Sequence, residues 1–132
     1  MVSSNEELEA YLSKLERNWE HTPDNTYLVG VTSGSPVALR LAPPLLVVHA
    51  EIGDVPTDDA PKEIKVLRRL LELNRSDLLH AAYGVEGNRI VLGSALELSN
   101  LDLNELEAVL SDMDLAMSEH VPVLRELVGV KA

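Results

Sequence analysis

The chain of 132 residues contains no cysteine and no phenylalanine, and only 3% of its residues are aromatic. Without cysteine it cannot form a disulfide, a thiolate metal site or a thiol nucleophile. Without phenylalanine, its core must be built mainly from leucine and valine. A chain of this length is expected to form a single domain, residues 1–132, that buries roughly two thirds of its unfolded surface.

Basic residues are also scarce: 11 lysines and arginines stand against 22 acidic residues, which gives a net charge of −11. A protein that binds nucleic acid needs a basic surface to displace counterions. Docking on an anionic membrane also needs a positively charged surface. We therefore expect neither nucleic acid nor membrane as a partner.

The chain has no long apolar run. The longest, residues 41–50, includes two prolines and a histidine and is far shorter than the roughly 20 residues that span a bilayer. The first residues lack the basic and then apolar pattern of a secretory signal. These absences predict a cytoplasmic protein.

Motifs for catalysis are missing as well: there is neither a serine elbow nor a glycine-rich phosphate loop. His49 and Glu51 lie two residues apart on one face of a predicted strand, where they could bind a metal or transfer a proton. A third ligand at a useful spacing is absent, and polar residues are common on half-exposed strands. The sequence thus predicts no catalytic residue, no metal and no cofactor.

Runs of β-branched and apolar residues, separated by turn signals, predict strands. There are five such runs, at residues 26–32, 37–41, 45–52, 78–85 and 89–98. Pro43 and Pro44 cannot donate to a strand ladder and belong in a connection. Gly87 and Asn88 provide a hairpin turn between the last two runs.

A first helix is expected to begin at Ser4, because Glu7 three residues later completes a capping box. The polar segment 18–25 is expected to end it. Its apolar face is made of residues at helical spacing. These are Leu8, Leu12, Leu15 and Trp19.

Two further helices are predicted. The second covers residues 62–74, with Asp58 and Asp59 as candidate caps. The third follows Asp102, which forms a second capping box with Glu105. Its apolar stripe consists of Leu103, Leu106, Leu110, Met113, Met117, Val121 and Leu124. Pro122 is expected to kink or end this helix.

The predicted order is therefore α-β-β-β-α-β-β-α. Short connections between the strands favour antiparallel pairing. We predict an α+β fold with one antiparallel five-stranded sheet packed with helices.

This order resembles the type III secretion chaperones of the Tir-chaperone (CesT) type and the related YbjN-like domains. The resemblance covers nearly the whole chain. It is carried by the first helix with Trp19, the strand block TYLVGVT/VALRL/LLVVHAEI, the helix KEIKVLRRLLELN and the run SDLLHAAYGVEGNRIVLGSALELSNLDLNELEAVL. It implies a non-enzymatic homodimer that holds an extended or partly unfolded segment of a client protein. The alternative is a YbjN-like regulatory or structural domain that binds a folded protein partner.

Two surfaces follow from this resemblance. The client is expected on apolar side chains of the first helix and first strands, partly by adding a strand to an exposed sheet edge. These side chains are Leu8, Tyr11, Tyr27, Val29 and Val31. The dimer is expected to form through the second helix, at Leu67, Arg68, Leu70 and Leu71. The alternative interpretation is core packing for the first set and a solvated charged face for the basic residues of the second helix.

Overall fold

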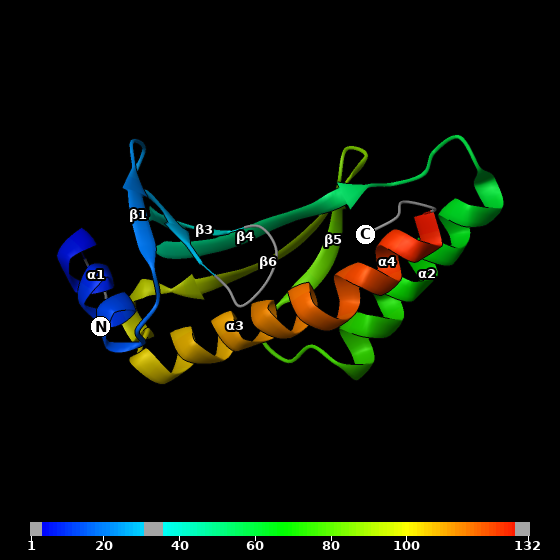
Figure 1. Cartoon of the computed structure of the whole chain (residues 1–132). Coiled ribbons are helices and arrows are strands. Elements are labelled where there is room, and N and C mark those ends of the chain that lie inside the picture. Colours follow the sequence, from blue (N-terminus) through cyan, green and yellow to red (C-terminus); the bar gives the residue numbers. More distant parts are fainter. Residues whose placement is uncertain (1–3, 31–35, 129–132) are drawn as a thin grey trace.

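The structure is a computed structural model that describes residues 4–30 and 36–128, and it contains one antiparallel sheet of six strands with helices (Figure 1). In chain order the elements are α1 (Asn5–Lys14), β1 (Trp19–Thr22), β2 (Thr26–Val29), β3 (Val37–Ala42), β4 (Leu45–Asp54), α2 (Ala60–Ser76), β5 (Ala82–Glu86), β6 (Arg89–Glu97), a 3₁₀ turn η1 (Leu98–Asn100), α3 (Leu103–Leu115), a π-helical turn η2 (Ala116–His120) and α4 (Val121–Val128). The α+β class is confirmed.

The strands lie in the order β1-β2-β3-β4-β6-β5. Strands β1 to β4 form a meander, and α2 then carries the chain across so that β6 pairs with β4 and β5 becomes the far edge. In Figure 1, α3 runs along one face of the sheet, α2 lies beside α4 at one end, and α1 lies near β1 at the other. The sheet therefore has two edge strands, β1 and β5.

The core fills the space between the sheet and α3. Alternate residues of each central strand are buried, and β3 shows the period of two clearly, with Val37, Leu39 and Leu41 inside. The predicted stripe of the last helix is confirmed, because Leu106, Leu110 and Met113 are fully buried. The segment remains helical around Pro122, but a π-helical turn separates α3 from α4 just before that proline.

All three predicted caps are present. The Ser4 hydroxyl accepts a hydrogen bond from the backbone N–H of Glu7 at 3.3 Å. Asp59 and Asp102 accept from the third residue of their helices, at 3.1 and 2.8 Å. These bonds satisfy amide donors that have no partner within the helix.

The strand count was wrong by one, because residues 18–25 do not simply end the first helix. The helix stops at Lys14, and Trp19 lies on the short strand β1 that pairs with β2. The stop is a Schellman motif: the N–H of Arg17 bonds the carbonyl of Leu12 at 3.1 Å, and Glu16 adopts a left-handed φ of 57°. Glycine normally marks this position, so a glutamate there gives little sequence signal.

Glu16→Gly is expected to raise the free energy of unfolding by about 0.5–1 kcal/mol, because glycine adopts a left-handed φ without steric cost. Urea denaturation measures the effect. Ala10→Gly, at an exposed position inside α1, is the matched control and should lower stability, since glycine weakens a helix interior. Equal losses for both variants would contradict the Schellman interpretation.

The predicted strand at 78–85 begins later, at Ala82. Residues 77–81 instead form a connection whose backbone is held by Asp112 of α3. One carboxylate oxygen of Asp112 accepts from the N–H groups of Leu79, His80 and Ala81 at 3.0, 2.6 and 3.0 Å. A backbone engaged in this way is not available to a strand ladder.

Candidate functional site

The edge strand β1 presents backbone groups that face outward. The N–H of Gly30 bonds the carbonyl of Asn18 at 2.9 Å, which fixes the alternation of the β1–β2 ladder. In an antiparallel pair, hydrogen-bonded and non-hydrogen-bonded positions alternate. The backbone N–H and C=O groups of Trp19 and His21 therefore point away from β2, and no described residue bonds them. This edge is open to another strand.

The opposite edge, β5, is capped by a side chain at Tyr83. Asn74 of α2 donates to the carbonyl of Tyr83 at 3.1 Å and accepts from its N–H at 2.7 Å, as a neighbouring strand would. Asp112 accepts a hydrogen bond from the N–H of Ala81, just before the strand begins. The two edges of the sheet thus differ: residues of α2 and α3 cap β5 at Tyr83 and Ala81, and no described residue caps β1.

Asn74→Ala is expected to lower the free energy of unfolding by about 1–3 kcal/mol, because both backbone groups of Tyr83 lose a partner. It should also expose a second edge and cause self-association that grows with concentration. Urea denaturation and light scattering measure the two effects. Asn104→Ala, on the exposed surface of α3, is the control and should change neither. A scattering signal equal to that of the wild type would show that the β5 edge is protected in another way.

Aromatic side chains gather behind the open edge. The imidazole of His21 stacks on the ring of Tyr27, with 4.4 Å between the ring centroids. Trp19 packs edge-on against the same ring, with 5.6 Å between the centroids. Tyr27 is fully buried and donates its hydroxyl to Glu9 of α1 at 2.5 Å. Burial and the Glu9 carboxylate raise the pKa of Tyr27, so the hydroxyl remains a donor at neutral pH. The cluster fixes β1 against α1.

A second candidate surface lies on the outer face of α2. Ile64 and Leu71 are 66% and 70% exposed, which is unusual for side chains of this size. Arg68 and Arg75 are exposed at the same helical spacing, and Leu67 is half-buried beside them. We call these five residues the α2 face. Arg68 also lies 3.9 Å from Glu72, but both side chains are exposed and such pairs contribute little.

The expected client surface needs correction. Leu8, Tyr27 and Val29 have no exposed area and belong to the core, so they offer no surface in the folded protomer. Tyr11 is half-buried against the core, and Val31 lies outside the described residues. What these elements do expose is a backbone edge suited to strand addition, and it belongs to β1, a strand that the sequence pattern did not predict.

The expected dimer surface is partly corrected too. Leu70 is only 4% exposed and packs in the core, whereas its neighbour Leu71 points outward. One face of α2 covers the sheet, and a rotation of 100° per residue puts consecutive leucines on different faces. Ile64, which the sequence-based set omitted, belongs to the exposed surface.

A buried polar cluster fixes the C-terminal end of α2. His120 lies in the π-helical turn and is 3% exposed. Its Nε2 is 2.9 Å from Asp77, and its Nδ1 is 2.9 Å from the Tyr83 hydroxyl. One neutral tautomer satisfies both contacts, with Nε2–H donating to Asp77 and Nδ1 accepting from Tyr83. Hydrogen bonds from His120 and then Ser76 lower the pKa of Asp77.

Asp77→Asn is expected to reduce the acid sensitivity of the fold. Because the pKa of Asp77 is lower in the folded state, its contribution to stability is present above roughly pH 4 and is lost as the pH falls through the lowered value. Urea midpoints of wild type and variant should therefore differ most at neutral pH and converge in acid. Asp58→Asn, in an exposed loop, is the control. Parallel profiles for wild type and Asp77→Asn would contradict the assignment.

His49 and Glu51 are not joined by a third metal ligand among the described residues. His49 is half-buried, and Glu51 accepts a hydrogen bond from Arg89 at 2.6 Å. Within residues 4–30 and 36–128, no three histidine or acidic side chains are arranged to hold a metal ion. None of the helices in these ranges has the length and apolar character needed to cross a bilayer.

The sequence and the overall fold, with its helix order α1 to α4 and six strands, both find parallels in known proteins. Residues 1–129 match the model of the CesT_Tir_1 family. The chain belongs to this family. No protein of curated function matches the sequence.

Solved structures share the fold of this family member. One chain of the heterodimeric complex ExoU–SpcU, from the type III secretion system of Pseudomonas aeruginosa, gives a TM-score of 0.71 at 20% identity, with 90% of this chain and 98% of that chain covered. YbjN from E. coli gives 0.59 at 13% identity, covering 91% and 96%. A chain of the HopA1–SchA chaperone–effector complex gives 0.56 at 14%, covering 90% of each. At these identities the likeness establishes the fold.

Proposed function

We propose that this protein is a non-enzymatic, homodimeric chaperone that binds an extended segment of a client protein by adding it as a strand to β1. The observation that carries the proposal is the outward-facing backbone of Trp19 and His21 on an open edge, while the other edge is capped at Tyr83. Strand addition of this kind uses main-chain hydrogen bonds for affinity. Membership of the CesT_Tir_1 family and the likeness to chaperone–effector complexes support it.

The single tryptophan provides a direct test of strand addition, since Trp19 lies on the edge strand itself. A synthetic peptide of alternating valine and threonine, titrated into the protein, should change the fluorescence of Trp19. His21→Pro should abolish the response, because proline removes the outward N–H but not a donor that β1 gives to β2.

His21→Ala is the matched control, because it loses the imidazole but keeps the N–H. Its peptide affinity should stay close to that of the wild type. Equal affinity of the proline and alanine variants would overturn strand addition at β1.

We infer that the α2 face is where two copies meet. Two exposed large apolar side chains on one helix face are typical of a partner surface, and a two-fold axis lets the same patch pack on itself. Sedimentation should show a dimer at micromolar concentration. Leu71→Asp should give a monomer, whereas Leu79→Asp, on an even more exposed leucine outside α2, should not. A monomeric wild type would end this proposal.

Because the chain has no cysteine, single introduced cysteines can show which residues of the α2 face meet in the dimer. Single cysteines placed at Ile64, Arg68, Leu71 and Arg75 each give a chain with one thiol. A disulfide across a two-fold axis forms only where a residue lies close to its own copy. Oxidation should therefore link one of these variants strongly, and a cysteine at Leu79 should stay unlinked.

A YbjN-like role is the second candidate, favoured by the structural likeness to YbjN. In that case the protein binds a folded partner and holds no extended segment. The peptide titration separates the two functions, because a domain that recognises only a folded surface gives no Trp19 response to the peptide.

A further inference from the structure

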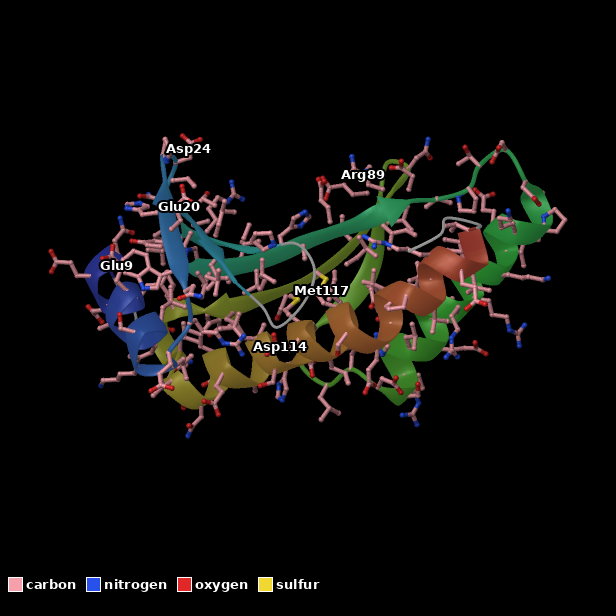
Figure 2. The ribbon with its side chains drawn as sticks, in the orientation of Figure 1. Glu9, Glu20, Asp24, Arg89, Asp114 and Met117 are labelled. Carbon is pink, nitrogen blue, oxygen red and sulfur yellow. The ribbon has the colours of Figure 1, made fainter. Side chains whose placement is uncertain are left out.

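The open edge lies at an acidic end of the molecule. Glu9, Glu20 and Asp24 come from α1, β1 and the turn after β1, and Figure 2 places all three at the same end. Glu20 and Asp24 are exposed, and Glu9 is half-buried beneath the Tyr27 hydroxyl. Three separate elements thus bring carboxylates around one strand.

Few basic groups offset these carboxylates. Arg17 is bound by Asp114, with 2.9 Å between Nη2 and Oδ2, and both side chains are largely buried. Lys14 lies exposed at the end of α1, and Arg40 lies on β3, two strands from the edge. A strand that approaches β1 therefore meets mainly negative charge, and the chain as a whole carries −11.

Glu20 occupies the position that matters most for a neighbouring strand. Its register partner on β2 is Leu28, so its side chain lies on the sheet face opposite to that of buried Tyr27. A strand paired with β1 places one side chain beside Glu20 on that face. An opposite charge there strengthens the pairing and a like charge weakens it.

We propose that the segment captured by β1 is basic, with lysine or arginine at alternate positions on the face of Glu20. This inference rests on the proposed strand addition and names the chemical class of the client. The basic side chain beside Glu20 supplies a cross-strand ion pair, and the surrounding carboxylates attract the segment before it docks. Main-chain bonds to Trp19 and His21 hold it regardless of its sequence.

Two synthetic peptides test the proposal. Both alternate valine with a polar residue, which is lysine in one peptide and glutamate in the other. Trp19 fluorescence should show the lysine peptide binding several-fold more tightly, about two- to fivefold from the cross-strand pair alone, with the difference shrinking as salt is raised. Equal binding of the two peptides, or tighter binding of the glutamate peptide, would overturn the basic preference while leaving strand addition intact.

Charge-reversal variants show whether the preference belongs to the edge. Glu20→Lys should narrow or invert the preference for the lysine peptide. Glu86→Lys makes the same change in net charge at the exposed end of β5, on the far edge of the sheet. This variant should keep most of the preference for the lysine peptide. Equal effects of both variants would show attraction to the whole molecule and overturn the assignment to β1. If neither peptide binds the wild type, strand addition itself fails.

Discussion

Replacing Leu110 with alanine is expected to lower the free energy of unfolding by about 2–5 kcal/mol. Leu110 has no exposed area and lies at the centre of the stripe with which α3 covers the sheet. The loss has two parts, the transfer free energy of the deleted carbons and the cavity they leave. The chain has no phenylalanine, so its aliphatic core depends on leucines of this kind.

Leu79→Ala is the matched control for this experiment. It makes the same chemical change at a leucine that is 85% exposed, and it should shift stability by less than about 0.5 kcal/mol. Urea denaturation of both variants gives the comparison. A Leu110→Ala midpoint equal to that of Leu79→Ala would place the stripe of α3 outside the core.

The core of this protein was predictable because it depends on local periodicity. The helical spacing of Leu106, Leu110 and Met113 indicates a buried face wherever the helix docks, and the structure places all three inside. The caps at Ser4, Asp59 and Asp102 were predictable for the same reason, since each involves residues three apart.

The candidate site was less predictable because its features depend on pairing between distant segments. An open edge exists only relative to the order of strands, and β1 is too short to show a period of its own. Its turn does carry a signal that was missed: Asp24 and Asn25 both adopt left-handed φ values, of 67° and 56°, which these residue types tolerate. Polar residues between Trp19 and Thr26 indicated a hairpin as well as a helix end.

The distinction between Leu70 and Leu71 shows the limit on α2. Both residues widen the apolar arc of the helix, and the sequence cannot tell which of them faces the sheet. Only the packed structure shows that Leu70 is buried and Leu71 exposed. The sheet therefore decides which leucines remain for a partner.

The same dependence on distant residues explains why Asp112 was not identified as important. It lies on α3 with apolar neighbours, and its partners are 31 to 33 residues earlier in the chain. A buried carboxylate is costly unless it is hydrogen-bonded. Asp112 meets that condition with three backbone donors, so its burial depends on the connection between α2 and β5.

Asp112→Ala is expected to lower the free energy of unfolding by about 3–5 kcal/mol, because three charge-assisted hydrogen bonds disappear and backbone donors of residues 79–81 lose their acceptor. The loss should also reach α2 and β5, since this connection joins them. Hydrogen exchange should accelerate most at the amides of Leu79, His80 and Ala81, whereas a general loss of packing would accelerate exchange throughout the core.

Two variants make the Asp112 result specific. Asp112→Asn keeps an oxygen acceptor without the charge and should lose clearly less stability than Asp112→Ala. Glu107→Ala removes an exposed carboxylate from the same helix and should change the free energy of unfolding by less than about 0.5 kcal/mol. If Asp112→Ala were as mild as Glu107→Ala, water would be replacing the carboxylate at the connection. The ends of α2 and β5 would then be held mainly by the contacts of His120 with Asp77 and Tyr83 and of Asn74 with Tyr83.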